Sequence, residues 1–256
     1  MQTEWSAVGD QAGAGIWYLV AVALPTLFVA LLAFFVLRAL IRRGRYRAVT
    51  VLDDDDHRAV HQALGEAERK TVGEILPVVV ERSDPHPGAE WLAALSFVIL
   101  GSSALLAWMP WRNPLAVLGA QVVLGALGFG LARWLPDLKR LFVFENRATE
   151  VAEEQAFQEF YANGLHRTEA ATGVLLFVSL LEHRVVILAD EGIDAKVEAE
   201  FWADTDDAIL DGIRAGSLRN GLVAGIHRAG NLLSEQFPWR EGDRNEIPDR
   251  LIVRRQ

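Results

Sequence analysis

The sequence contains no cysteine, which excludes disulfide bonds and metal centres with cysteine ligands. It also lacks a basic surplus, because 25 Lys and Arg residues stand against 34 Asp and Glu residues and the net charge is −9. A nucleic-acid-binding domain needs an extended basic face, so we expect no nucleic-acid partner. The sequence has no P-loop, no dinucleotide-binding fingerprint and no Ser-His-Asp spacing, so these enzyme classes have no support.

Charged residues are missing altogether from three long stretches, which are residues 16–37, 91–111 and 114–132. A helix rises about 1.5 Å per residue, so about 20 apolar residues cross a hydrocarbon core of about 30 Å. The first stretch predicts a transmembrane helix over residues 16–41, after a leader of residues 1–15. The other two stretches are separated by only two residues and predict a transmembrane helical hairpin over residues 89–135.

Basic residues indicate how the predicted membrane helices are oriented. The leader has no Lys or Arg, whereas five arginines follow the first apolar stretch: Arg38, Arg42, Arg43, Arg45 and Arg47. Arg133, Lys139 and Arg140 follow the hairpin. By the positive-inside rule we expect three spans in a bacterial inner membrane, with the leader outside and both polar segments in the cytoplasm. The less favoured alternative for the arginine cluster is a site for lipid headgroups or nucleic acid.

Four consecutive aspartates, Asp53 to Asp56, open the next segment. Acidic residues cap free N–H groups at the start of a helix, so the run predicts a helix that continues to about Arg69. A calcium loop is the alternative, but the glycine and the distal glutamate of an EF-hand are absent. A strand over residues 73–82 follows. Pro77 predicts that this strand lies at a sheet edge or is interrupted, because proline donates no backbone hydrogen bond.

Two continuously apolar runs, residues 173–181 and 184–189, are joined by a short polar break. Runs of this kind predict a β-hairpin in a sheet that is buried on both faces. Glu74 at the start of the earlier strand and Arg167 before the hairpin are expected to form an ion pair. Apolar periodicity predicts helices over residues 145–162, 195–202, 204–214 and 217–237, followed by a surface tail over residues 238–256.

An acidic turn directly follows the hairpin and contains Asp190, Glu191 and Asp194. Carboxylates at a strand end suit Mg²⁺ or Ca²⁺, and such an ion would polarise a phosphoryl oxygen. Arg184 or Arg214 would then bind the phosphate in bidentate fashion. The alternative is that these acids cap the helix that follows. No catalytic residue is assigned, and only their residue type makes His166 and His183 candidate acid–base groups.

Eight different short motifs lie between residues 53 and 253: GEI at 73–75, LHRT at 165–168, TGVLLFVS at 172–179, RV at 184–185, ADEGI at 189–193, GL at 221–222, DRNE at 243–246 and PDRL at 248–251. Together they resemble the TPM domain, and more narrowly its bacterial membrane-protein branch, in which a transmembrane hairpin interrupts the domain. The resemblance implies an α/β/α sandwich. We expect residues 53–88 and 136–237 to form this sandwich around the inserted hairpin.

The resemblance also carries functional expectations. Known TPM domains are linked to photosystem repair, to receptor accessory roles, and in some cases to weak acid phosphatase activity or divalent-metal binding, and bacterial members often occur beside proteins of the LemA family. We expect a binding or scaffold module for the assembly or maintenance of envelope proteins rather than an enzyme. The alternative is a phosphatase that depends on Ca²⁺ or Mg²⁺. The expected partners are the lipid bilayer, envelope proteins such as LemA-like proteins, and a second copy of the chain.

Overall fold

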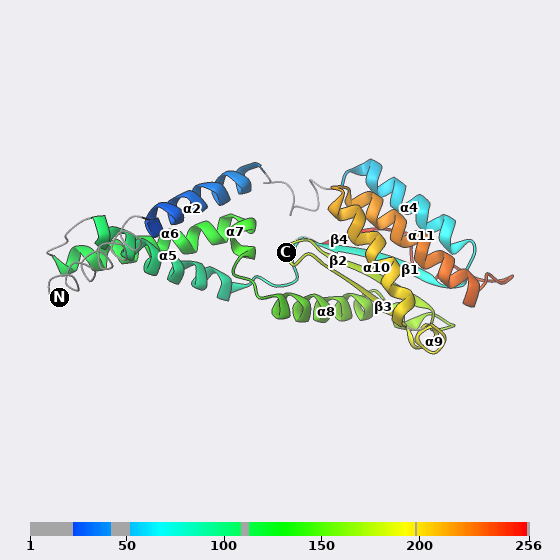
Figure 1. Ribbon diagram of the computed structural model, residues 1–256. Coiled ribbons are helices and arrows are strands. Elements are labelled where there is room, and N and C mark those ends of the chain that lie inside the picture. Colours follow the sequence, from blue (N-terminus) through cyan, green and yellow to red (C-terminus); the bar gives the residue numbers. More distant parts are fainter. Residues whose placement is uncertain (1–22, 42–51, 109–112, 198, 255–256) are drawn as a thin grey trace, which may run out of the picture. The chain divides into compact units, whose positions relative to one another are not determined.

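The computed structural model describes residues 23–41, 52–108, 113–197 and 199–254. These residues belong to two compact units (Figure 1). The first unit contains α2 (Leu24–Ile41), α5 (Pro87–Trp108), α6 (Pro114–Trp134) and α7 (Pro136–Arg140). All the remaining helices and strands belong to the second unit. The predicted leader, the start of the first predicted span and four arginines of the basic cluster lie outside the described residues.

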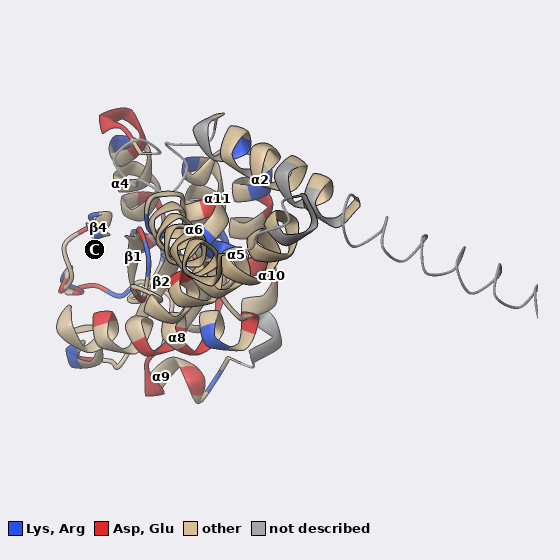
Figure 2. Ribbon diagram, turned by 90° about the vertical axis from the view of Figure 1, so that its left-hand side faces the viewer, with Lys and Arg blue, Asp and Glu red and all other residues tan. Residues whose placement is uncertain are grey.

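The first unit is a bundle of apolar helices in which α5 and α6 pack against each other. Residues Pro87–Leu105 and Pro114–Trp134 are long and apolar enough to cross a membrane. Both helices are almost entirely uncharged (Figure 2) and expose large apolar side chains, including Leu95, Ile99, Leu115 and Val122. Asn113 caps α6 by accepting a hydrogen bond from the Leu115 N–H at 3.0 Å, so the polar break predicted between the two stretches is present.

Buried charges tie α7 to its neighbours within this unit. The carboxylate of Glu90 accepts a hydrogen bond from Lys139 Nζ at 2.9 Å, and both side chains are buried. Arg133 approaches the same carboxylate at 3.6 Å. On α2, Arg38 lies 3.9 Å from the buried carboxylate of Asp137. Each buried charge therefore has an opposite charge beside it, as low-dielectric surroundings require.

The second unit is built on a four-stranded mixed sheet with the order β3-β2-β1-β4. Its strands are β1 (Glu74–Val80), β2 (Gly173–Ser179), β3 (Arg184–Ala189) and β4 (Ile252–Arg254). β1 is parallel to β2 and β4, and β2 is antiparallel to β3. The predicted hairpin is confirmed with its boundaries close to those expected. Every residue of β1 and β2 is buried, whereas β3 is half-buried because it lies at an edge.

Helices cover both faces of this sheet. On one face, α4 (Asp54–Glu68), α10 (Ala199–Arg214) and α11 (Leu218–Gln236) enclose a core with Ile75 and Leu176. On the other face, α8 (Glu145–Ala162) encloses a second core with Leu76 and Phe177 (Figure 1). The alternation of neighbouring residues between the two cores follows from the two-residue period of a strand. The fold is thus a mixed α/β sheet, as the apolar runs predict.

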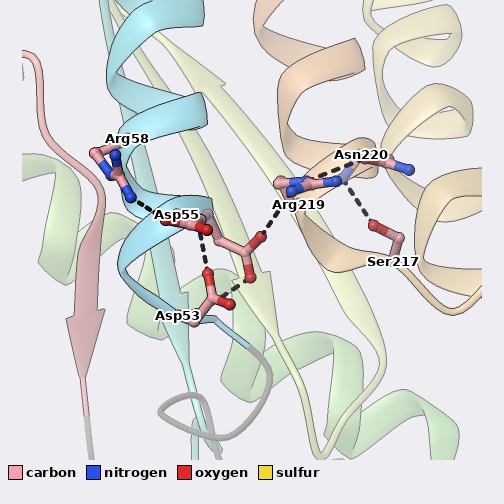
Figure 3. Close-up of polar contacts among 7 residues, drawn as sticks. Asp53, Asp55, Arg58, Ser217, Arg219 and Asn220 are labelled. Carbon is pink, nitrogen blue, oxygen red and sulfur yellow. Dashed lines mark hydrogen bonds and ion pairs between the residues drawn. The ribbon is translucent and has the colours of Figure 1, made fainter.

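The four aspartates cap α4, as predicted. Asp53 accepts a hydrogen bond from the Asp56 N–H at 2.9 Å, and Asp56 accepts one from the Asp53 N–H at 3.1 Å. This reciprocal capping box occupies two of the free N–H groups at the start of the helix. Asp55 pairs with Arg58, and Asp56 lies 3.4 Å from Arg219 at the start of α11 (Figure 3). The run therefore fixes one helix and joins it to a second.

Two expectations about the second unit, one on the tail and one on the segment after the acidic turn, were wrong. The tail does not simply run over the surface, because Ile252–Arg254 pairs with β1 as the fourth strand. The segment after the acidic turn forms the four-residue α9 (Glu191–Asp194) and a single helix α10, in place of the two helices predicted over residues 195–214. Buried Thr205 and Ile209 continue one face of α10 across the predicted break.

The expectation that the strand with Pro77 lies at a sheet edge or is interrupted was wrong, because β1 is an uninterrupted inner strand. β1 pairs with β2 along its whole length, but β4 pairs only with Val78–Val80. Pro77 therefore lies where β1 has a strand neighbour on one side only. The missing N–H is tolerated there for the same reason that proline is tolerated at a sheet edge.

Candidate functional site

The acidic turn lies at the amino edge of the sheet, which we define as the end where β1 and β2 begin. β3 runs antiparallel to β2, so its last residue meets the first residues of β2. The Asp190 N–H accordingly donates to the Gly173 carbonyl at 2.9 Å. Ligands of α/β folds usually bind at the other end, where parallel strands finish. The acidic turn therefore lies at the end of the sheet opposite to the usual ligand-binding end, because β3 is antiparallel.

Within the turn, Asp190 caps α9. Its Oδ1 accepts a hydrogen bond from the Glu191 N–H at 2.9 Å. Its Oδ2 is buried and has no hydrogen-bond partner among the residues that the structure describes. Glu191 and Asp194 are exposed. Although Asp194 is exposed as a residue, its carboxyl is partly shielded from solvent, and this shielding together with the charge of Asp190 raises its pKa above the usual range.

Gly192 allows the turn to approach the preceding loop closely. Its N–H donates to the Ala171 carbonyl at 3.1 Å. A Cβ atom at this position would lie 2.6 Å from the carbonyl oxygens of Ala170 and Ala171. Only glycine permits this contact, so the turn and the start of β2 are held together by the backbone.

The geometry agrees with the capping interpretation of the acidic turn. Within residues 23–41, 52–108, 113–197 and 199–254, no group of three or more His, Asp or Glu side chains could hold a metal ion. The predicted Mg²⁺ or Ca²⁺ site at Asp190, Glu191 and Asp194 stays a prediction.

The structure does not gather the predicted phosphate-binding residues at the turn. Arg184 begins β3 and Asp190 follows its end, so about 20 Å of extended chain separates them. Arg184 donates from Nε to Thr149 Oγ1 at 2.9 Å and from Nη2 to Glu145 at the start of α8. Arg214 pairs with Asp211 at 3.0 Å in the last turn of α10.

The two candidate histidines lie at opposite edges. His166 precedes β2, and its ring centroid lies 4.8 Å from that of Tyr161. Its Nε2 accepts a hydrogen bond from Arg167 at 3.3 Å. His183 lies in the turn between β2 and β3, at the carboxyl edge, with a left-handed φ of 52°. They do not form one acid–base pair.

The amino edge also holds a cluster of carboxyl groups, which the sequence pattern did not identify as a cluster. Glu74 is buried and accepts hydrogen bonds from the N–H groups of Glu246 at 2.9 Å and Ile247 at 3.3 Å. The prediction of an ion pair between Glu74 and Arg167 was therefore wrong, because backbone N–H groups of the folded-back tail bind the Glu74 carboxylate instead. Burial raises the pKa of Glu74, and the charges of Glu246 and Asp243 raise it further.

Glu68 is the most perturbed acid of this edge. Its Oε1 accepts a hydrogen bond from the Ile75 N–H at 3.1 Å. Burial raises its pKa to about 9, and the neighbouring carboxyl groups of Asp249 and Glu74 raise it further. Its Oε2 is buried and has no hydrogen-bond partner among the described residues. Its carboxyl group is therefore protonated at neutral pH. Because Asp249 is far from Glu68 and Glu74 in the sequence, no spacing could have predicted that it lies beside them.

At the carboxyl edge, a buried carboxylate fixes the end of the parallel pair. Both oxygens of Glu182 accept hydrogen bonds from the Ser83 N–H at 3.1 Å, and Oε2 also accepts one from Ser179 Oγ. Ser83 Oγ donates to Ser179 Oγ at 3.0 Å. Asp84 lies 3.5 Å from Arg147 of α8. These contacts hold the chain at the point where it leaves the second unit for α5.

The family model of the TPM domain matches residues 139–232. This chain contains a TPM domain. The predicted resemblance to that family is thereby confirmed. The matched residues contain α8, the hairpin β2–β3, α9, α10 and most of α11, whereas α4, β1 and β4 complete the same compact unit from outside them.

A solved structure shows a similar fold. It is the NMR structure of BA42 protein from the psychrophilic bacterium Bizionia argentinensis, with 20% sequence identity and a TM-score of 0.52. The match covers 81% of this chain and 99% of that chain. Identity at this level compares folds and not activities. Comparison of the sequence with curated proteins finds no match.

Proposed function

We propose that this protein is a membrane-anchored TPM domain that acts as a binding or scaffold module in the assembly or maintenance of bacterial envelope proteins, including LemA-like proteins. In this proposal the TPM domain is an α/β/α sandwich interrupted by the transmembrane hairpin α5–α6, with α2 as a further span. The apolar exteriors of α5 and α6 carry the proposal.

Those exteriors are suited to lipid rather than water. Leu115 is 75% exposed, Val122 73% and Trp134 83%, and further exposed aliphatic residues continue along both helices. A water-soluble protein rarely exposes a contiguous apolar patch of this extent. Trp91 and Trp134 both lie at the end of the hairpin opposite to Asn113, where exposed tryptophans suit the interface between lipid and water.

The proposed orientation can be measured because the chain has no native cysteine. Single cysteines at Ser83, Asn113 and Ser217 would be treated with an impermeant thiol reagent in intact cells. The positive-inside rule leads us to expect labelling at Asn113 only. Ser217 is the better of the two cytoplasmic probes, because Ser83 is hydrogen-bonded to Glu182. Labelling of the cysteine at position 217 in intact cells would show that the orientation is the reverse of the one proposed.

Binding is favoured over catalysis because the candidate catalytic groups have structural partners. Asp190 caps α9, Arg184 joins β3 to α8, and Arg214 pairs along its own helix. We expect the full chain in detergent to release no p-nitrophenol from p-nitrophenyl phosphate beyond the blank, with or without Mg²⁺ or Ca²⁺. The proposal fails if there is metal-dependent turnover that Asp190→Asn abolishes and the exposed control Asp211→Asn retains.

The second candidate is a divalent-metal-dependent phosphatase. One observation favours it: beyond the effect of partial burial, the charge of Asp190 raises the pKa of Asp194, so a cation between the two carboxyl groups would relieve their repulsion. Calorimetric titration of the full chain with Mg²⁺ and Ca²⁺ tests this candidate. Saturable binding that is lost in Asp190→Asn/Asp194→Asn, with a higher melting temperature when metal is bound, would support it. The absence of both effects would exclude a site at this turn.

A further inference from the structure

The outer edge of β3 is an unpaired strand edge. In the part of the chain that the structure describes, β3 has a strand neighbour on its β2 side only. All six of its residues are half-buried, and Arg184 is its only charged residue. Natural sheets usually protect their edges with short strands, charges or proline, because unpaired backbone groups recruit other strands. The opposite edge has such protection, since β4 has three residues and ends at Arg254.

The hydrogen-bond phase of β3 determines which backbone groups face outward. The Asp190 N–H donates to Gly173, so Asp190 belongs to a hydrogen-bonded pair with β2. Every second residue back along β3 shares that phase, so the backbone groups of Arg184, Val186 and Leu188 face β2. The N–H and C=O groups of the residues between them therefore point to the open edge. These are Val185, Ile187 and Ala189.

We propose that the β3 edge is an interface with a second copy of this chain, in which the two β3 strands pair antiparallel about a two-fold axis at Ile187. This register places Ile187 opposite its own counterpart and Val185 opposite Ala189 of the second copy. All outward N–H and C=O groups are then used, in about six hydrogen bonds. Two four-stranded sheets become one continuous sheet of eight strands.

Charge complementarity favours a second copy over an unrelated strand. In the same register, Arg184 lies directly opposite Asp190 of the second copy, on the α8 side of the sheet. Directly opposed residues of opposite charge stabilise antiparallel pairs. Oδ2 of Asp190 is buried and has no partner within the described chain. A guanidinium has about five N–H donors, and the donations from Arg184 to Thr149 and Glu145 come from Nε and Nη2. The two-fold axis creates this pair twice.

Disulfide trapping of the full chain in detergent tests the register. Two Ile187 residues in a hydrogen-bonded pair have Cα atoms about 5.5 Å apart, within the range that a disulfide spans. Ile187→Cys is expected to give a covalent dimer on mild oxidation. Val186→Cys is the matched control, because it lies opposite Leu188 and about 7–8 Å diagonally from its own counterpart. We expect it to cross-link at least tenfold more slowly, and the double variant Val186→Cys/Leu188→Cys to cross-link rapidly.

Light scattering in detergent provides a second measurement. Ile187→Pro removes an outward N–H without removing a hydrogen bond to β2, so it is expected to convert the dimer to a monomer. Ile187→Ala, which keeps the N–H, is expected to remain dimeric. Circular dichroism verifies that each variant is folded. A monomeric wild-type chain, equal cross-linking of Ile187→Cys and Val186→Cys, or a dimer that persists in folded Ile187→Pro would each overturn the proposal. The last result would instead indicate association through α5 and α6.

Discussion

Replacing Glu68 by glutamine is expected to stabilise the TPM domain, by an amount that increases with pH. The pKa of Glu68 is raised from 4.5 to about 9 by burial and by the neighbouring acids Asp249 and Glu74. In the folded chain this acid is therefore protonated over a pH range in which it is ionised in the unfolded chain. Glutamine resembles the protonated side chain: its carbonyl can accept from the Ile75 N–H, and its amide adds no charge beside Asp249 and Glu74.

The sign and size of the effect follow from proton linkage. Between pH 4.5 and about 9 the folded state holds one more proton at Glu68 than the unfolded state, so the wild-type free energy of unfolding falls as pH rises through this range. At about 1.4 kcal/mol per pH unit, the loss is roughly 3 kcal/mol at pH 7 and roughly 6 kcal/mol at pH 9. These are upper limits, because local relaxation would reduce them. Near pH 4.5 the variant and the wild type should have similar stability.

Thermal unfolding of both proteins in detergent between pH 5 and 9, followed by circular dichroism, measures this difference. A gain of roughly 3 kcal/mol corresponds to a rise in the melting temperature of roughly 6–12 °C for a domain of this size. Some decrease with pH should remain in the variant, because the pKa values of Glu74 and Asp194 are also raised. The reasoning is refuted if the two melting temperatures fall in parallel, or if the glutamine variant melts lower at pH 8.

Two further substitutions test packing and charge pairing. Gly192→Ala should destabilise the TPM domain by more than about 2 kcal/mol in chemical unfolding, because the added Cβ would lie 2.6 Å from two carbonyl oxygens. Gly88→Ala is the control: no atom lies within 4 Å of its added Cβ, so it should change stability by less than about 1 kcal/mol. Lys139→Met should destabilise the helical unit by about 3 kcal/mol because it leaves the buried Glu90 with only the exposed Arg133. Adding Glu90→Gln should restore most of that loss in detergent unfolding, and a double variant no more stable than the single one would contradict the explanation.

Local sequence signals predicted most of the elements of the fold. The aspartate run and the apolar runs of the hairpin each act within a few residues, and the structure has both. The boundary within 195–214 was wrong because α10 is continued by burial of Thr205 and Ile209, which depends on packing against α11. The central place of Pro77 was unpredictable from β1 alone, because it depends on where β4 stops pairing.

The candidate site was less predictable for a related reason. The sequence correctly placed Asp190 at a strand end, but whether that end is the amino or the carboxyl edge depends on strand direction. The acids with raised pKa, Glu68 on α4 and Glu74 on β1, are perturbed by residues of the tail that meet them only in three dimensions. Their pKa values depend on burial and on mutual repulsion, which no spacing encodes.

The order of the strands also determines when the TPM domain can fold during synthesis. β1 pairs with β2 from Glu74 to Gly173, so about 100 residues must be made between the two halves of the parallel pair. At about 5–20 residues per second, β1 waits for roughly 5–20 s while α5 and α6 emerge. An apolar strand that waits this long is vulnerable to aggregation. Insertion of the hairpin into the membrane would hold β1 close to the bilayer and away from other nascent chains, so the interruption that delays the sheet would also protect it.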